Sequence, residues 1–158
     1  MDRSRHEETE KLTDACQNGD AAACERIVPD LERACGEGRA SNCNYLAWLF
    51  RGGHGVAADL RRAAGYLEQA CSAGDRRNAC IEHAWMRLNG EGLAKDERSG
   101  AAALQGLCDE GVLEACTRLA INLVSKPAAA DRRRAKALVS RACEGGEQQA
   151  CSMAKQIP

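Results

Sequence analysis

Aromatic residues and prolines are scarce in this sequence. Aromatic residues make up 3% of the 158 residues, and there are only three prolines. Because β-sandwiches and β-barrels are rich in aromatic and β-branched residues, this composition argues against them and suits closely packed helices. The 44% hydrophobic content is enough for a folded core, which excludes a disordered chain.

A surplus of one charge and a long apolar run are also missing. The chain has 22 Lys and Arg against 23 Asp and Glu, so no basic excess favours nucleic acid or an anionic membrane as partner. No apolar run approaches the roughly 18 residues of a transmembrane helix, and the N-terminal MDRSRHEETEK lacks the apolar stretch of a signal peptide. We therefore expect no nucleic-acid partner and no transmembrane segment.

Cysteine, in contrast, is abundant and regularly spaced. The ten cysteines form pairs separated by eight or nine residues, and a glycine follows three residues after the first cysteine of each pair. Because glycine is the usual residue at a left-handed helix C-terminus, each pair predicts a helix end, a turn and a new helix. The pairs are Cys16/Cys24, Cys35/Cys43, Cys71/Cys80, Cys108/Cys116 and Cys143/Cys151, and the glycines are Gly19, Gly38, Gly74, Gly111 and Gly146.

This turn makes local disulfides possible. Two residues eight apart on one continuous helix would lie about 12 Å apart, beyond the roughly 4.4–6.8 Å between the Cα atoms of a disulfide. A turn at the glycine folds them together, so we predict that each pair is a disulfide joining one helix to the next. The alternatives are free cysteines buried as small apolar residues, and a zinc site, which the lack of CxxC spacing disfavours.

The cysteine pairs also mark a repeat. From Cys35 onward their first members follow at 36, 37 and 35 residues, the period of a helix-turn-helix solenoid. Each block contains a helix A, a loop and a helix B that begins near an aspartate able to accept N-terminal N–H bonds. Glycines break helix A at 53, 55, 90 and 92, and the aspartates are Asp59, Asp96 and Asp131.

These features resemble the SEL-1-like repeat (SLR), a tetratricopeptide relative with the approximate pattern A-x-x-x-L-G-x-x-Y-x-x-G-x-G-V-x-x-D-x-x-K-A. The match is clearest in LAWLFRGGHGVAADLRRAAGYLEQACSAG and extends over about residues 13–155. With its cysteine pairs, the chain is similar to the disulfide-rich branch typified by the Helicobacter cysteine-rich proteins. The resemblance implies an all-α, right-handed α/α superhelical solenoid with disulfide-stapled helix pairs.

We predict one repeat domain over residues 1–158 with half-units at its ends. The sequence departs from the pattern in two places. In the last full repeat, SKPAAAD replaces the G-x-G loop. The first repeat is so short that only Val28-Pro29-Asp30 would separate its two helices, and Pro29 would start the second helix. The predicted parts are a leading helix (3–18), a short repeat (19–38), three full repeats (39–74, 75–111 and 112–146) and a capping helix (147–155).

In such repeats the A helices line the concave face, which is the candidate partner-binding surface. Trp48 and Trp85 occupy the same repeat position, where they either form an aromatic binding surface or fill the core between repeats. His83 and Arg87 stand where neighbouring repeats have apolar residues, so they need polar partners, a path to solvent or a ligand. The predicted surface comprises Asn44, Trp48, Arg51, His83, Trp85, Arg87 and Leu88.

The sequence gives little support for catalysis. It has no GxSxG, HExxH, P-loop or dinucleotide motif, and SMAK at Ser152 lacks the companion motifs of serine β-lactamases. We predict a monomeric, noncatalytic module that binds a partner protein or peptide, without cofactor or metal, in the periplasm or secreted after removal of a signal peptide. The alternatives are a cell-envelope β-lactam or peptidoglycan-fragment binder or hydrolase, a redox- or cofactor-linked assembly factor, and a cytosolic location.

Overall fold

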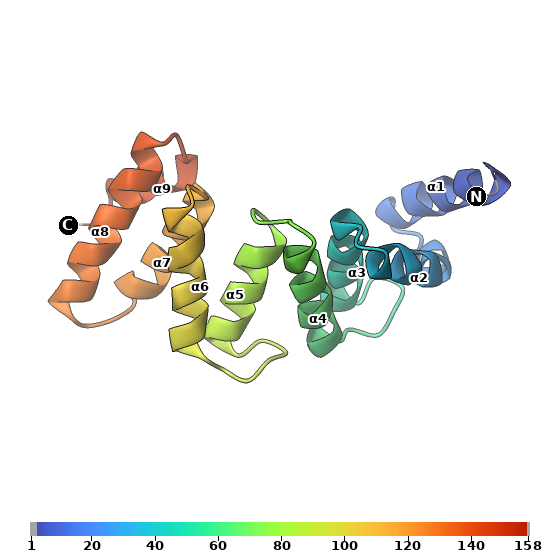
Figure 1. The fold of residues 1–158 in the computed structure, drawn as a ribbon, viewed down its shortest axis with the longest axis horizontal. Helices are drawn as coiled ribbons and strands as arrows, with labels where there is room; N and C mark the ends of the chain where they lie inside the picture. Colours follow the sequence, from blue (N-terminus) through green and yellow to red (C-terminus); the bar gives the residue numbers. More distant parts are fainter. Residues whose placement is uncertain (1–2, 158) are drawn as a thin grey trace. The chain divides into compact units, whose positions relative to one another are not determined.

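The computed structural model describes residues 3–157, and within them the secondary structure is entirely helical (Figure 1). The predicted all-α class is confirmed. Each of the three predicted full repeats contains one helix pair. The helices are α1 (Arg3–Gln17), α2 (Ala21–Gly36), α3 (Ala40–Gly52), α4 (Leu60–Ser72), α5 (Ala79–Asn89), α6 (Glu97–Asp109), α7 (Leu113–Val124), α8 (Ala129–Glu144) and α9 (Gln148–Ala154).

The helices group into two compact units. The first contains α1–α4 and the short segment Glu91–Ala94, and the second contains α5–α9. Within each unit, helices that follow one another in sequence pack against each other, as α3 does on α4 and α7 on α8. A repeat array buries its apolar residues between neighbours and has no common centre, so it can divide in this way. The single repeat domain stays a prediction.

The turns between paired cysteines have the predicted geometry. After each first cysteine the chain turns at a glycine with φ between 86° and 104°. The helix closes there with reversed bonds, such as Gly38 N–H to Cys35 O and Arg39 N–H to Ala34 O. Each turn therefore brings the start of the following helix back beside the end of the preceding one.

The predicted disulfide pairing is confirmed. The first cysteine of each pair is the penultimate residue of one helix, and the second lies in the first turn of the next. Cys71 and Cys80 are disulfide-bonded, and the described residues include no free cysteine, so the free-cysteine and zinc alternatives are wrong. The other four disulfides join Cα atoms 4.5–4.8 Å apart and are Cys16–Cys24, Cys35–Cys43, Cys108–Cys116 and Cys143–Cys151.

The disulfide cysteines lie at the joints between helices. Cys24, Cys43 and Cys116 are buried, and Cys151 on the last helix is half-buried. Because a nucleophile or metal ligand must be a free thiolate, a sulfur bonded in a disulfide can serve as neither. In the disulfide-bonded form, these residues link one helix to the next.

The prediction for the short first repeat is wrong. Residues 21–36 form one continuous helix, α2, with Pro29 inside it, and not two helices separated by a loop. Ile27 and Leu31 are buried at helical spacing, whereas Pro29 is exposed. Because Pro29 has no N–H, the carbonyl of Glu25 lacks its helical donor. Pro29 lies on the solvent side of α2, where water can bind this carbonyl, and burial of the opposite face keeps the helix intact.

Glycines in the A–B loops allow these loops to lie directly on a preceding helix. A Cβ atom at Gly55 would stand 2.2 Å from the carbonyl oxygen of Ala21, and one at Gly92 would stand 2.2 Å from that of Leu60. Both glycines also have positive φ, at 70° and 67°. The second glycine of the G-x-G motif thus permits a close contact between backbones, which any side chain would prevent.

Two of the three predicted aspartate caps are confirmed. Asp59 accepts the N–H of Arg62 at 3.0 Å, and Asp96 accepts that of Ser99 at 2.9 Å. Asp131 is not a cap, because α8 begins two residues earlier, after Ala128, which offers no capping side chain. Alanine has the highest helix propensity, so the run that follows Pro127 becomes helical before the aspartate is reached.

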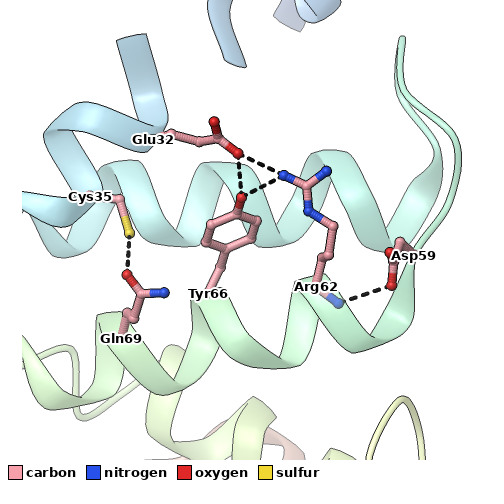
Figure 2. Close-up of polar contacts among 6 residues, drawn as sticks. All are labelled: Glu32, Cys35, Asp59, Arg62, Tyr66 and Gln69. Atoms are coloured by element: carbon pink, nitrogen blue, oxygen red, sulfur yellow. Dashed lines mark hydrogen bonds and ion pairs between the residues drawn. The ribbon is translucent and has the colours of Figure 1, made fainter. Parts of the chain in front are cut away.

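A polar cluster ties α2 to α4 within the first unit (Figure 2). The guanidinium of Arg62 donates to Glu32 at 2.6 Å, and the Tyr66 hydroxyl donates to the same carboxylate at 2.7 Å. The Arg62 guanidinium also lies 3.9 Å above the Phe50 ring. Burial and the bond to Glu32 raise the pKa of Tyr66. The cluster fixes α4 against both α2 and α3.

Candidate protein-binding surface

Helix α3 presents the most exposed large apolar side chain among the described residues. Trp48 is 43% exposed, although Leu46 and Phe50 on the same helix are buried. The helical period places the latter two toward neighbouring helices, whereas Trp48 projects from the opposite side. Trp48 is therefore a surface residue, and the core alternative does not hold for it.

Trp48 is held in an aromatic stack that we call the α3 platform: Tyr45, Trp48 and His54. The centroid of the Trp48 ring lies 3.9 Å from that of the His54 ring, with an angle of 13° between the ring planes. It lies 5.5 Å from the centroid of the Tyr45 ring. The Tyr45 hydroxyl is buried without a hydrogen-bond partner, and burial raises its pKa. The stack gives the tryptophan a fixed orientation at the surface.

Polar residues of the first unit flank the α3 platform. Asn44 donates to the carboxylate of Asp75, and Arg51 pairs with Glu91 at 3.2 Å. Asn44 and Arg51 belong to the predicted surface, and both lie on α3 with Trp48 at i, i+4, i+7 spacing, which is one face of a helix. An apolar centre with a polar rim is the arrangement typical of protein interfaces.

Sequence reasoning missed Tyr45 and His54. His54 follows Gly53, whose φ of 68° reverses the chain at the end of α3, and its ring folds back over Gly52, where a Cβ atom would lie 2.1 Å from Nε2. The G-G-H sequence offers a weak signal for this contact, because two glycines leave room for a ring to fold over them.

The remaining predicted residues lie on α5 in the second unit. Trp85 is half-buried, and the guanidinium of Arg118 lies 5.1 Å above its ring while pairing with Glu82 at 2.9 Å. His83 and Arg87 are also half-buried, at positions where α3 and α7 have fully buried apolar residues. Trp85 is thus less accessible than Trp48 and is covered on one face by a cation–π contact.

Leu88 was wrongly assigned to the surface. Only 1% of it is exposed, whereas Arg51 and Val124, its equivalents on α3 and α7, are exposed. The reason lies on α6, where Gly100 replaces the alanine of the other repeats. A Cβ atom at Gly100 would lie 2.7 Å from the Cβ of Leu88, so the missing methyl group admits the leucine into the contact between α5 and α6.

The structure also bears on two other kinds of site, a metal site and the serine of the SMAK sequence. Residues 3–157 contain no cluster of three or more His, Cys, Asp or Glu placed to hold a metal ion. Ser152 donates to the carbonyl of Gln148 at 3.2 Å on an exposed helix face. None of the helices in this range is both long enough and apolar enough to span a membrane.

The fold and surface define a helical repeat protein whose helix pairs are joined by disulfides. Comparison with solved structures shows which repeat fold it has. It resembles Helicobacter pylori cysteine-rich protein B with a TM-score of 0.53 and 24% identity, over 68% of this chain and 88% of that one. It also resembles a Sel1 repeat protein from Oxalobacter formigenes with a TM-score of 0.63 and 24% identity, over 83% of this chain and 98% of that one.

A third structure is a protective antigen of uropathogenic Escherichia coli strains that displays an SLR fold, with a TM-score of 0.71 and 19% identity over 92% of this chain. The match spans 32% of the length of that antigen. No family model and no curated protein matches the sequence. The chain therefore has the SLR solenoid fold, and the resemblance that its sequence indicates is confirmed at the level of the fold.

Proposed function

We propose that this protein is a noncatalytic interaction module that binds a partner protein or peptide through the α3 platform. The observation that carries this proposal is the exposed Trp48, whose ring stacks with those of Tyr45 and His54. A large aromatic side chain held rigid at the surface gains contact area on binding and loses little conformational entropy. Tryptophan is also among the residues that dominate measured binding energies.

The same proposal includes the compartment. Disulfides persist in secreted and periplasmic proteins and are rare in the cytosol, and all ten cysteines of this chain are disulfide-bonded. We infer that the protein works outside the cytoplasm and meets its partner there.

The experiment compares two exposed apolar residues. Partners are cross-linked to the protein in its native compartment, identified, purified and titrated against the wild-type protein, Trp48→Ala and Leu60→Ala. Leu60 is a matched control because it is 41% exposed on α4, outside the α3 platform. Trp48→Ala is expected to weaken binding about 30-fold, equivalent to about 2 kcal/mol, and Leu60→Ala to leave it unchanged.

Circular dichroism and thermal unfolding establish that both variants keep the fold. Equal affinity of the wild-type protein and a folded Trp48→Ala variant would exclude the α3 platform as the binding surface.

A further inference from the structure

A second candidate surface lies in the first unit, between α2 and the segment that joins α3 to α4. It is a recess of about 770 Å³ that shares no residue with the α3 platform. Val28 and Pro29 line it from α2, and Val56, Ala57 and Ala58 line it from the joining segment. The side chains that line the recess from these two elements are therefore small and apolar.

The joining segment has backbone donors with no partner in the protein. Two bonds fix its ends, one from the His54 N–H to Leu49 O at 3.0 Å and the other from the Asp59 N–H to Phe50 O at 2.7 Å. Between them, the N–H groups of residues 55–58 donate to no acceptor within the described chain. Free backbone groups beside apolar side chains are the features with which an exposed strand edge captures an extended peptide.

The opposite wall contains a backbone carbonyl that lacks its helical donor. Pro29 has no N–H, so the carbonyl of Glu25, four residues earlier on α2, lacks its usual helical donor. Glu25 lines the same recess. A chain lying in the recess is therefore between the unpaired N–H groups of residues 55–58 and Glu25 on the opposite wall.

The charges in the recess favour a basic occupant. The Glu25 carboxylate is exposed and forms no ion pair in the described chain. The nearby positive charge of Arg62 is already engaged by Glu32 at 2.6 Å. The accessible charge is thus negative, and it complements lysine or arginine.

We propose that this recess binds an extended peptide segment of alternating apolar and basic residues, with its backbone paired to residues 55–58 and a basic side chain near Glu25. This inference rests on the proposed interaction function and gives the chemistry of a partner segment at a second surface. Alternation fits because successive side chains of an extended chain point to opposite sides.

The test measures fluorescence polarisation of short labelled peptides with the full 158-residue, disulfide-intact chain. The probe alternates valine and lysine. One control peptide replaces lysine with glutamate, and another carries N-methyl groups on its valines. We expect saturable binding of the probe and at least about tenfold weaker binding of both controls, because repulsion or the loss of one or two hydrogen bonds costs about 1.4 kcal/mol or more.

Variants locate the binding site. Glu25→Gln is expected to weaken probe binding about two- to fivefold, the usual effect of an exposed ion pair. Glu68→Gln, the same change at an exposed α4 position outside the recess, should leave it unchanged. Trp48→Ala tells the two surfaces apart, because Trp48 belongs to the α3 platform and does not line the recess.

Two results would overturn the inference: no saturable binding of the probe, or equal binding of the N-methylated peptide. Loss of probe binding in Trp48→Ala but not in Glu25→Gln would also overturn it and would place the peptide on the α3 platform, so that the proposed function would survive the failure of this inference.

Discussion

At the scale of single residues, two kinds of glycine have opposite effects on this fold. Gly92 has positive φ and touches the backbone of Leu60, whereas Gly65 lies inside α4 with open space where a Cβ would be. The first is required by backbone packing. The second adds only conformational freedom to the unfolded chain.

We therefore predict opposite signs for the same substitution at these glycines. Gly92→Ala should lower the free energy of unfolding by about 2 kcal/mol or more, because the left-handed backbone is strained and the methyl group meets a carbonyl oxygen. Gly65→Ala should raise it by about 0.5–1 kcal/mol. Urea denaturation measures both changes, and a stabilising Gly92→Ala would contradict the backbone contact.

At the scale of elements, a carboxylate that caps a helix makes the stability of that helix depend on pH. The side chain of Glu147 accepts N–H bonds from Gln149 and Ala150 at the start of α9, and the hydroxyl of Thr117 on α7 donates to it at 2.8 Å. Partial burial acts to raise the pKa of Glu147, but these three bonds outweigh it and lower the pKa. One carboxylate thus caps α9 and fixes it to α7.

The lowered pKa predicts a loss of stability in acid. A carboxyl group with a depressed folded-state pKa contributes stability above its unfolded pKa, near 4.5, and that contribution disappears as the pH falls through the lower folded value. NMR of the Gln149 and Ala150 amides against pH should show this transition. Thr117→Val should move it to higher pH, and an unchanged midpoint would show that the Thr117 bond does not affect the titration.

At the scale of the whole molecule, the disulfides join successive helices across short turns. Each disulfide closes a loop of eight or nine residues. By constraining the unfolded chain, such a disulfide raises the free energy of unfolding by about 2–3 kcal/mol. Because contacts in a repeat array are local, these links act one joint at a time. The cysteines therefore strengthen the joints between helices that already have apolar faces.

Alkylation and intact mass measurement test this oxidation state. The denatured, unreduced protein should incorporate no alkylating reagent, and the reduced protein should incorporate ten equivalents, one for each cysteine. Reduction should also lower the midpoint of urea denaturation. Ten alkylated thiols without reduction would exclude the disulfides and remove the main support for a location outside the cytoplasm.

Some structural features could be read from the sequence because they depend on local spacing. The cysteine and glycine intervals predict the helix ends, the turns and the disulfide pairs, since each involves residues fewer than ten positions apart. The caps at Asp59 and Asp96 are local in the same sense. The repeat period predicts a helix-turn-helix solenoid because it sets the length of each helix pair, and the resemblance of the motifs to the SEL-1-like repeat implies the SLR fold.

The tertiary structure decided the points that depend on what lies opposite a residue. Pro29 remains helical because the buried face of α2 outweighs one lost hydrogen bond that faces water. Leu88 is buried because Gly100 on α6 leaves it space, although its repeat position is exposed elsewhere. His54 joins Trp48 only through the chain reversal at Gly53. The sequence alone therefore determined the repeat and its disulfide joints, and tertiary packing determined which side chains are available for binding.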